Sequence, residues 1–499
     1  MVGEDRRQLC WWAAVIAIAF AGLALRVVAA HGALWTDEAW SVIYAAEARD
    51  PLGVFLRINH DNNHHLYSLW LQAIGIDASP LLVRTPAILA GSLAIIVAAA
   101  LVGRRSRIGG MVAALLFAFS PTMLVFGSEA RGYAMMLLAA LMMLLLVGDE
   151  VDRRSIRGAR WWLAGLAVFG MFSHLTMAAP VALAALWFYL ERRAEVGPRE
   201  ALPVTLRLMG PALAAAAGVI LFVFAAAAVS PTGMRLGGYA PFSERDFTAA
   251  LYDLGVWSAG VATPLPLLAP LLVAGAALFI LYRRPAWLGS HARLYALLLL
   301  ALPVAVVVLR PGNSGFPRYY LVCALGLLLL LSEWIGRGLM ARGPARTGAA
   351  ALLAVVLVVS TYGDERLIVA ERGHPDAALH DIAQLSPKGA RVAFDQPRLA
   401  ATVTLVAKQI NYSVRFAAGC SPAEFFLASQ SRWKPTAKTV ERCGVLMRAI
   451  DSSVITPMTG DSWVLYRAES LQSPGALVSG RLPGEQNRRF SGRAGVAQG

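Results

Sequence analysis

The sequence contains little charge and almost no lysine. Only 15% of its 499 residues are charged, whereas soluble globular chains average about 25%. Its lysines are Lys388, Lys408, Lys434 and Lys438, so arginine carries nearly all of the positive charge. The formal net charge of +14 falls mainly in short segments between apolar runs. We therefore expect no nucleic-acid partner, because that function needs a basic face on a soluble domain.

Several motif classes are absent as well. The chain has no Walker A loop, no Gly-x-Gly-x-x-Gly turn opening a helix, and no His-Glu-x-x-His motif. It also shows no internal repeat. The lack of nucleotide-binding motifs argues against nucleotide-dependent chemistry. The lack of an internal repeat weighs against a transporter, since transporters usually contain repeats. A polytopic transporter or lipid flippase stays as the alternative function.

Cysteine is scarce, with four in the chain. Cys10 and Cys323 lie at or within apolar runs and are expected to be small apolar fillers. Cys420 and Cys443 lie in the C-terminal region without metal-type spacing. They either form a disulfide, if that region faces an oxidising compartment, or remain free thiols.

Hydrophobic residues are abundant, at 57%. Apolar runs of roughly 17–25 residues, the length of a membrane span, recur through the first 360 positions. About eleven spans are predicted, at residues 11–30, 82–103, 109–126, 133–148, 161–175, 176–190, 206–229, 262–282, 294–310, 319–335 and 347–362. Arginine clusters follow alternate spans, which places the N-terminus in the cytoplasm and the C-terminal region outside. This topology requires residues 65–76 to lie along the interface rather than cross.

The predicted fold is therefore an all-α polytopic membrane domain over residues 1–362, with its first outer loop at 31–81. Beyond it, "HPDAALHDIAQL" predicts a helix, and "RVAFD", "CGVLMRAI" and "SWVLYRA" predict strands. We expect a small extracytoplasmic α/β domain over residues 363–470. A disordered tail is predicted over residues 471–499, which are rich in Gly, Ser, Arg and Gln.

Two adjacent carboxylates, Asp37 and Glu38, lie between Trp35 and Trp40 just after the first apolar run. Carboxylates near hydrocarbon are energetically costly, so they usually have a function or a partner. Such a group can act as general base on an acceptor hydroxyl or bind a divalent cation. The alternative is a solvated pair at a helix end beside interfacial tryptophans.

Other polar residues are predicted at the same boundary. His64 and His65 precede the interfacial segment and suit phosphate binding or metal ligation, with a hydrated loop as the alternative. Glu129 and Arg131 lie in "SEARGY" near a predicted span end. Arginine suits bidentate phosphate recognition; the alternatives are a surface ion pair and snorkelling side chains.

Three further positions complete this set. Arg84 opens a predicted span and is expected to pair with a carboxylate. Arg318, followed by Tyr319, opens another and either binds phosphate or anchors the span in the interface. His174 lies at a turn between two predicted spans, where a purely structural role is the stronger alternative. Together, these residues predict a site for a phosphate-bearing lipid whose tail remains in the bilayer.

Four sequence motifs, in order, resemble one known family: "LWTDEAWS", "DNNHHLYSLWLQ", "RTPAILAGSLAI" and "SPTMLVFGSEARGYA". They are similar to motifs of the GT-C superfamily of membrane glycosyltransferases. The resemblance is to the branch of protein O-mannosyltransferases, lipid A aminoarabinose transferases and rhizobial lipid A galacturonosyltransferases. It covers about residues 10–220 well and is limited beyond them to "FPRYYL" and an outer C-terminal domain.

The resemblance implies a polyprenyl-phosphate-sugar donor and transfer on the outer face, usually with inversion at the anomeric carbon. It implies catalysis by the acidic pair, with Asp37 as base or acceptor-positioning residue. The His-Pro-Pro-Leu-Tyr pattern of the family aligns with His64 to Tyr67, but here the prolines are missing. The "SQEARxY" pattern aligns with Ser128 to Tyr133, without its glutamine. In that pattern Glu129 orients the acceptor or a cation, and Arg131 the donor phosphate.

The sequence therefore predicts an integral glycosyltransferase of the bacterial plasma membrane. Its donor would be a polyprenyl-phosphate-linked sugar, and its acceptor an envelope glycolipid or polysaccharide. Which sugar and which acceptor are used, and whether a divalent cation is required, are left open.

Overall fold

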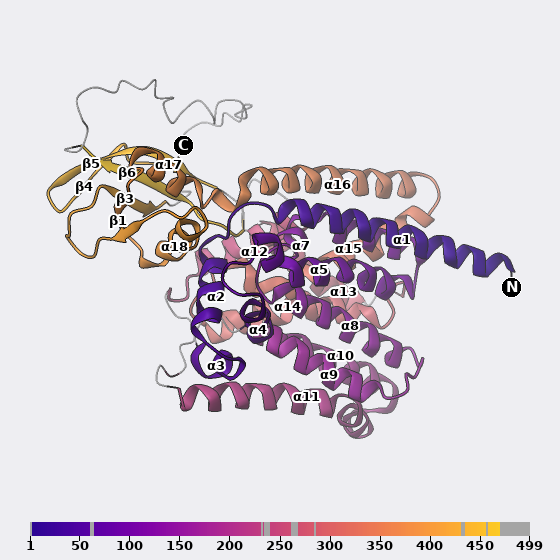
Figure 1. Cartoon of the computed structure of the whole chain (residues 1–499). Helices are drawn as coiled ribbons and strands as arrows, with labels where there is room; N and C mark the ends of the chain where they lie inside the picture. Colours follow the sequence, from indigo (N-terminus) through magenta and orange to yellow (C-terminus); the bar gives the residue numbers. More distant parts are fainter. Residues whose placement is uncertain are drawn as a thin grey trace. The chain divides into compact units, whose positions relative to one another are not determined.

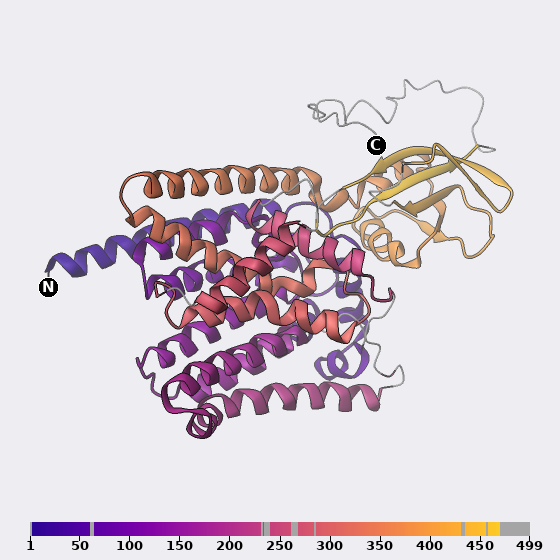
Figure 2. The same ribbon diagram turned by 180° about the vertical axis from the view of Figure 1, so that it is seen from behind.

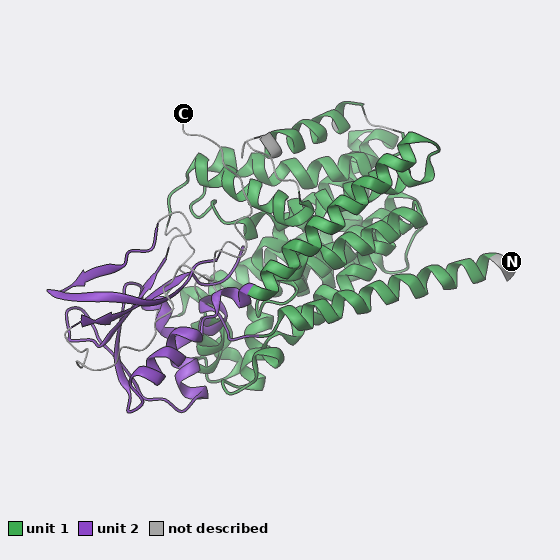
Figure 3. Ribbon diagram, turned by 90° about the horizontal axis from the view of Figure 1, so that it is seen from above, with its two compact units in different colours: residues 1–31, 41–369 green, residues 32–40, 370–499 purple. Residues whose placement is uncertain are grey.

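The computed structural model describes residues 2–59, 64–230, 233, 240–260, 268–283, 286–430, 435–455 and 458–469. The predicted tail at 471–499 lies outside this set. The chain divides into two units, of which unit 1 comprises residues 1–31 and 41–369, and unit 2 comprises residues 32–40 and 370–499 (Figure 3). The short segment 32–40, which contains both predicted catalytic carboxylates, thus belongs with the C-terminal region.

Unit 1 is helical, and its long helices run beside one another (Figures 1 and 2). Its elements are α1 (Val2–Ala29), α2 (Thr36–Glu47), α3 (Pro51–Arg57), α4 (His65–Ile74), α5 (Pro80–Gly103), α6 (Arg107–Phe119), α7 (Pro121–Phe126), α8 (Tyr133–Val151), α9 (Ala159–Ser173), η1 (Leu175–Met177), α10 (Ala178–Val196), α11 (Pro198–Ala228), α12 (Glu244–Ala259), α13 (Leu268–Arg283), α14 (His291–Leu309), η2 (Pro317–Tyr320), α15 (Leu321–Met340) and α16 (Pro344–Ala370). Helix α2 begins in the unit 2 segment and continues into unit 1.

Seven helices in the described part of the chain are long and apolar enough to cross a membrane. They are α1, α5, α8, α11, α14, α15 extended by η2, and α16 extended by η3. The predicted multi-span body is confirmed, whereas the number eleven stays a prediction. Of the other expected spans, 109–126 and 161–175 correspond to shorter helices, and α10 carries charged residues near its end. The first part of the expected span 262–282 lies outside the described residues, and α13 begins at Leu268.

The predicted span 109–126 is one example of the difference. It is broken into α6 and α7 at Ser120 and Pro121. Proline opens α7 because its ring and missing N–H do not suit a helix interior but suit a first turn. Helix α4, the predicted interfacial segment, has 10 residues and is too short to span a bilayer.

Unit 2 contains a mixed six-stranded sheet in the order β2-β1-β3-β6-β5-β4. Strands β2, β1 and β3 are parallel, and β3, β6, β5 and β4 are antiparallel. Its elements are η3 (Glu371–Gly373), α17 (Ala377–Leu385), β1 (Ala390–Phe394), η4 (Pro397–Leu399), α18 (Ala400–Gln409), β2 (Val414–Phe416), β3 (Phe425–Ser429), β4 (Thr439–Arg442), β5 (Val445–Ser453) and β6 (Trp463–Ala468). The predicted helix and three strands are present.

Alternation along β6 explains how this sheet is covered. Trp463 and Leu465 enter a core with residues of α17 and α18, whereas Val464 and Tyr466 pack among strand residues on the other face. Successive side chains of a strand point to opposite faces, so one face carries both helices. Cys420 and Cys443 form a disulfide within this unit.

Candidate functional site

His64 and Arg131 form the centre of a polar cluster in unit 1. Arg131 Nε donates a hydrogen bond to His64 Nε2 at 3.1 Å, and both side chains are buried. Because a guanidinium cannot accept, Nε2 must be the unprotonated nitrogen. Nδ1 then carries the proton and donates to the carbonyl of Ser173 at 3.3 Å. The amide of Gly132 lies equally close to Nδ1 but cannot donate to a protonated nitrogen.

The histidines of this region are neutral. Burial lowers the pKa of His64 well below its usual 6.5, and the charge of Arg131 lowers it further. Burial also lowers the pKa of His65 to about 4. Both imidazoles therefore act as hydrogen-bonding groups near neutral pH, and the positive charge of the cluster comes from arginine.

Aromatic rings surround the same guanidinium. The Cζ atom of Arg131 lies 5.2 Å from the ring centroid of Tyr133, within the range of cation–π attraction. The ring centroid of His174 lies 4.6 Å from that of Tyr133 and 4.8 Å from that of His64. Nδ1 of His174 is 2.6 Å from the hydroxyl of Thr176. His174 is thus part of the cluster and also caps the turn into η1.

The turn between α7 and α8 fixes Arg131 and Glu129. The amide of Arg131 donates to the carbonyl of Glu129 at 2.7 Å, and their charged atoms lie 3.8 Å apart. Gly132 allows this turn to pack closely on the end of α9, because a Cβ there would lie 1.9 Å from the carbonyl oxygen of Ser173. The "SEARGY" segment therefore forms a buried turn, and Glu129 and Arg131 are not a surface ion pair.

Arg318 belongs to η2, and its charge acts on the ring of His174, which places it near the cluster. Its Cζ atom lies 4.6 Å from the Phe316 ring centroid and 5.7 Å from that of Tyr319. These contacts are compatible with both predicted roles of the segment, phosphate binding and interfacial anchoring.

Arg84, Tyr67 and His65 make contacts that hold the fold. Arg84 Nη1 donates to the carbonyl of Ala30 at 2.8 Å, where it satisfies the end of α1. The hydroxyl of Tyr67 donates to the carbonyl of Val83 at 2.9 Å. His65 stacks on Phe55 with the ring centroids 5.3 Å apart. A substrate-binding role for these three residues remains a prediction.

In unit 2, Asp37 and Glu38 occupy the first turn of α2 and differ in their surroundings. Glu38 is fully buried, and its Oε2 accepts from the amide of Trp35 at 3.3 Å. A carboxylate at the third helical position that bonds the amide of the N-cap residue is half of a capping box. Asp37 instead forms an ion pair with Arg398, with 2.5 Å between Oδ1 and Nη2. A catalytic role for either carboxylate stays a prediction.

Two residues that sequence reasoning missed meet this turn. Arg398 precedes α18, and Asp461 precedes β6. Oδ2 of Asp461 accepts from the amide of Thr36 at 2.8 Å and from its hydroxyl at 2.9 Å. More than 350 residues separate these partners, and no local pattern marks them.

A third missed residue, Arg26, is buried in α1. Its guanidinium donates to the carbonyls of Gly22, Phe117 and Met123, at 3.0, 3.0 and 3.3 Å. It thereby satisfies carbonyls at the break between α6 and α7. The sequence signal was a single arginine inside an apolar run.

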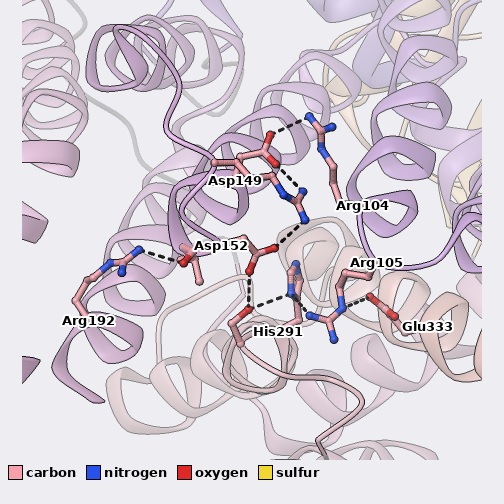
Figure 4. Close-up of polar contacts among 10 residues, drawn as sticks. Arg104, Arg105, Asp149, Asp152, Arg192, His291 and Glu333 are labelled. Carbon is pink, nitrogen blue, oxygen red and sulfur yellow. Dashed lines mark hydrogen bonds and ion pairs between the residues drawn. The ribbon is translucent and has the colours of Figure 1, made fainter. Parts of the chain in front are cut away.

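A separate network of ion pairs joins residues at or near the ends of α5, α8, α10 and α14 to Glu333 within α15 (Figure 4). Asp149 pairs with Arg104 at 2.9 Å and Arg154 at 3.0 Å. Arg105 pairs with Glu333 at 3.3 Å and lies 3.1 Å from His291 Nδ1. Several arginines that the sequence assigned to topology therefore also join helices.

No group of three or more His, Cys, Asp or Glu side chains among the described residues has the arrangement of a metal site. A divalent cation therefore stays an open prediction.

No family model and no curated protein sequence match the chain, but solved structures do. ArnT from Cupriavidus metallidurans in the apo state is 13% identical, with 94% of this chain and 100% of that chain covered, and a TM-score of 0.49. The structure of ArnT from Cupriavidus metallidurans bound to undecaprenyl phosphate is 14% identical. The match covers 94% of this chain and 99% of the ArnT chain, with a TM-score of 0.45. The archaeal oligosaccharyltransferase AglB from Archaeoglobus fulgidus is 13% identical. The match covers 85% of this chain and 70% of the AglB chain, with a TM-score of 0.44.

These matches are to two ArnT structures and to AglB, at 13–14% sequence identity. The similarity covers most of the length of this chain.

Proposed function

We propose that the protein is a membrane glycosyltransferase that moves a sugar from a polyprenyl-phosphate donor to an envelope glycolipid or polysaccharide. The observation that carries this proposal is the Arg131 guanidinium, held between the acceptor nitrogen of His64 and the face of Tyr133. A fixed guanidinium suits a phosphate oxygen, because it offers several donors in one plane.

The proposed reaction is a direct displacement at the anomeric carbon. The carboxylate of Asp37 accepts the proton of the acceptor hydroxyl as that oxygen forms the new bond to the sugar. The bond between the sugar and the phosphate oxygen breaks, and polyprenyl phosphate leaves with the bonding electrons. Arg131 and Arg318 stabilise its charge. Phosphate is already a good leaving group, so no general acid is required.

We place the site on the outer face of a bacterial plasma membrane. The Cys420–Cys443 disulfide supports an oxidising compartment for unit 2, since disulfides persist there and are rare in the cytosol. The arginine pattern of the sequence supports the same orientation.

The test is mass spectrometry of envelope glycolipids and polysaccharide from a deletion strain. The strain is complemented with wild type, with Asp37→Asn, or with Glu47→Gln, a control at the exposed far end of the same helix. We expect one sugar to be lost and its polyprenyl-phosphate precursor to accumulate in the Asp37→Asn strain alone. Identical profiles at equal protein levels would contradict the proposal.

A further inference from the structure

We propose that the C-terminal sheet domain holds the reacting carboxylate in place, with Arg398 and Asp461 as positioning residues for Asp37. This inference rests on the proposed function, but it concerns residues outside every motif that suggested that function. Its basis is the set of contacts within unit 2 between segment 32–40 and the C-terminal residues.

Arg398 binds the first turn of α2 at two points. Its Nη2 pairs with Asp37 at 2.5 Å, and its backbone carbonyl accepts from Nε1 of Trp40 at 3.0 Å. Positions 37 and 40 are three residues apart and so lie on one face of a helix. One residue of the C-terminal domain therefore fixes both the carboxylate and the orientation of the turn that carries it.

Asp461 binds the start of the same turn. Its carboxylate accepts both the amide and the hydroxyl of Thr36, the residue before Asp37. The first amides of a helix have no partner inside it, so this carboxylate supplies one and also suits the helix dipole. Helix α2 thus takes acceptors for its first turn from the C-terminal domain as well as from Glu38.

The backbone around Asp461 is itself fixed. Its amide donates to the carbonyl of Arg372 at 2.9 Å. Gly460 has φ +123°, and a Cβ at Gly373 would lie 1.8 Å from the carbonyl oxygen of Asp461. A Cβ at Gly460 would lie 2.6 Å from the carbonyl oxygen of Arg372, so both glycines allow the segment carrying Asp461 to pack closely against residues 372–373.

The exposed fractions of Arg398 and Asp37 indicate whether their ion pair contributes to stability or to orientation. The side chain of Arg398 is 58% exposed, whereas that of Asp37 is 9% exposed. An ion pair with one partner in solvent adds little to folding stability. Orientation of a reacting group is more sensitive, because a small misplacement can cost about 100-fold in rate. The contact is therefore expected to matter for turnover more than for stability.

The test uses full-length protein with Arg398→Gln, Arg398→Lys and Asp461→Asn. Arg415→Gln is the control, because Arg415 is exposed on strand β2 of the same domain. Hydrogen–deuterium exchange is followed on peptides covering residues 35–40, and sugar transfer is measured as kcat and KM for the donor. Thermal unfolding checks that every variant is folded.

We expect Arg398→Gln and Asp461→Asn to speed exchange of the 35–40 amides and to lower kcat by about 10-fold or more, with KM changed less than about twofold. Arg398→Lys should recover part of kcat, and Arg415→Gln should match wild type. Unchanged exchange, or unchanged kcat in both variants, would overturn the positioning role. If wild type transfers no sugar from any donor tested, the proposed function fails, and exchange alone still decides whether the domain holds this segment.

Discussion

Arg131 and His64 are joined by a hydrogen bond of 3.1 Å across 67 residues of sequence. The bond fixes the tautomer of the histidine and the direction of the guanidinium together. His64 therefore acts on the proposed phosphate site through Arg131, as a neutral acceptor.

Removing this acceptor should weaken donor binding. In His64→Leu, the buried Nε–H group of Arg131 loses its partner, and such a loss costs about 1.5–3 kcal/mol for a charged group. We expect polyprenyl phosphate to bind about 10–100-fold more weakly, as measured by titration of the purified protein. His64→Gln, whose amide oxygen can accept, should lose less. Equal losses in both variants would contradict the acceptor role.

Gly132 should tolerate no side chain. In Gly132→Ala the new Cβ would lie 1.9 Å from the carbonyl oxygen of Ser173, so the turn carrying Arg131 must move. We expect less folded protein and loss of transfer activity. Gly165→Ala is the matched control, because no atom lies within 4 Å of its Cβ position. In that helix interior, alanine should stabilise by about 0.5–1 kcal/mol. Size-exclusion profiles and melting temperatures distinguish the two.

The stability of the C-terminal domain should depend on Asp461. Burial, the largest cause, raises the pKa of this carboxyl to about 7, and the charge of Asp37 adds to it, while the donors of Thr36 oppose it. A raised pKa means that the folded state binds more protons than the unfolded state between about pH 4 and 7, so stability falls as pH rises through that range. The residue is enclosed by neighbouring atoms but keeps some contact with solvent, which screens its charge, so we expect a change in stability of about 1–2 kcal/mol. Asp461→Asn should remove this dependence in melting curves recorded from pH 4 to 8.

The ion-pair network of Figure 4 should support stability rather than catalysis. In Asp149→Asn, the largely buried carboxylate that pairs with Arg104 and Arg154 is lost. We expect a loss of about 1–2 kcal/mol, shown by a lower melting temperature in detergent. Activity per folded molecule should not change. Glu4→Gln, at an exposed position near the N-terminus, serves as the control. A large fall in kcat for Asp149→Asn would contradict this assignment.

The disulfide provides a test of orientation. Cys420 and Cys443 should react with a membrane-impermeant maleimide in intact spheroplasts only after reduction. Cys10, exposed and near the N-terminus, should react only after the membrane is made permeable. The opposite labelling pattern would contradict the proposed topology. Cys420→Ser should also lower the stability of the domain by about 2–4 kcal/mol.

The features predicted from sequence were those with local signals. Apolar length predicted the multi-span body, and short strand-like runs predicted strands β1, β5 and β6. Strands β2 and β4 were missed because they are short and partly exposed, with 3 and 4 residues. Strand β3 was missed although it has 5 residues, the same length as β1. The broken span at Ser120 had a signal in Pro121, but apolar length outweighed it.

Of the candidate site, the sequence predicted the residues that lie in motifs but not the distant residues that contact them. Motifs identified Asp37, His64, Glu129 and Arg131, and the structure brings the last three together in unit 1. They did not identify the partner of Asp37, since Arg398 lies 361 residues away in a region without a motif. Which distant side chain meets a given carboxylate depends on tertiary packing, and a single sequence does not encode this in any local pattern.

Residues 32–40 and the C-terminal region form one unit although more than 300 residues separate them in the chain. A fragment starting at residue 370 would lack residues 32–40 of this unit. A chimera that exchanges only the C-terminal region with a related protein would combine residues 32–40 of one protein with the C-terminal region of another. A transplant that keeps the interface intact must carry both segments, with Thr36, Asp37 and Trp40 moving together with Arg398 and Asp461. The same grouping predicts which positions must change together as such proteins diverge.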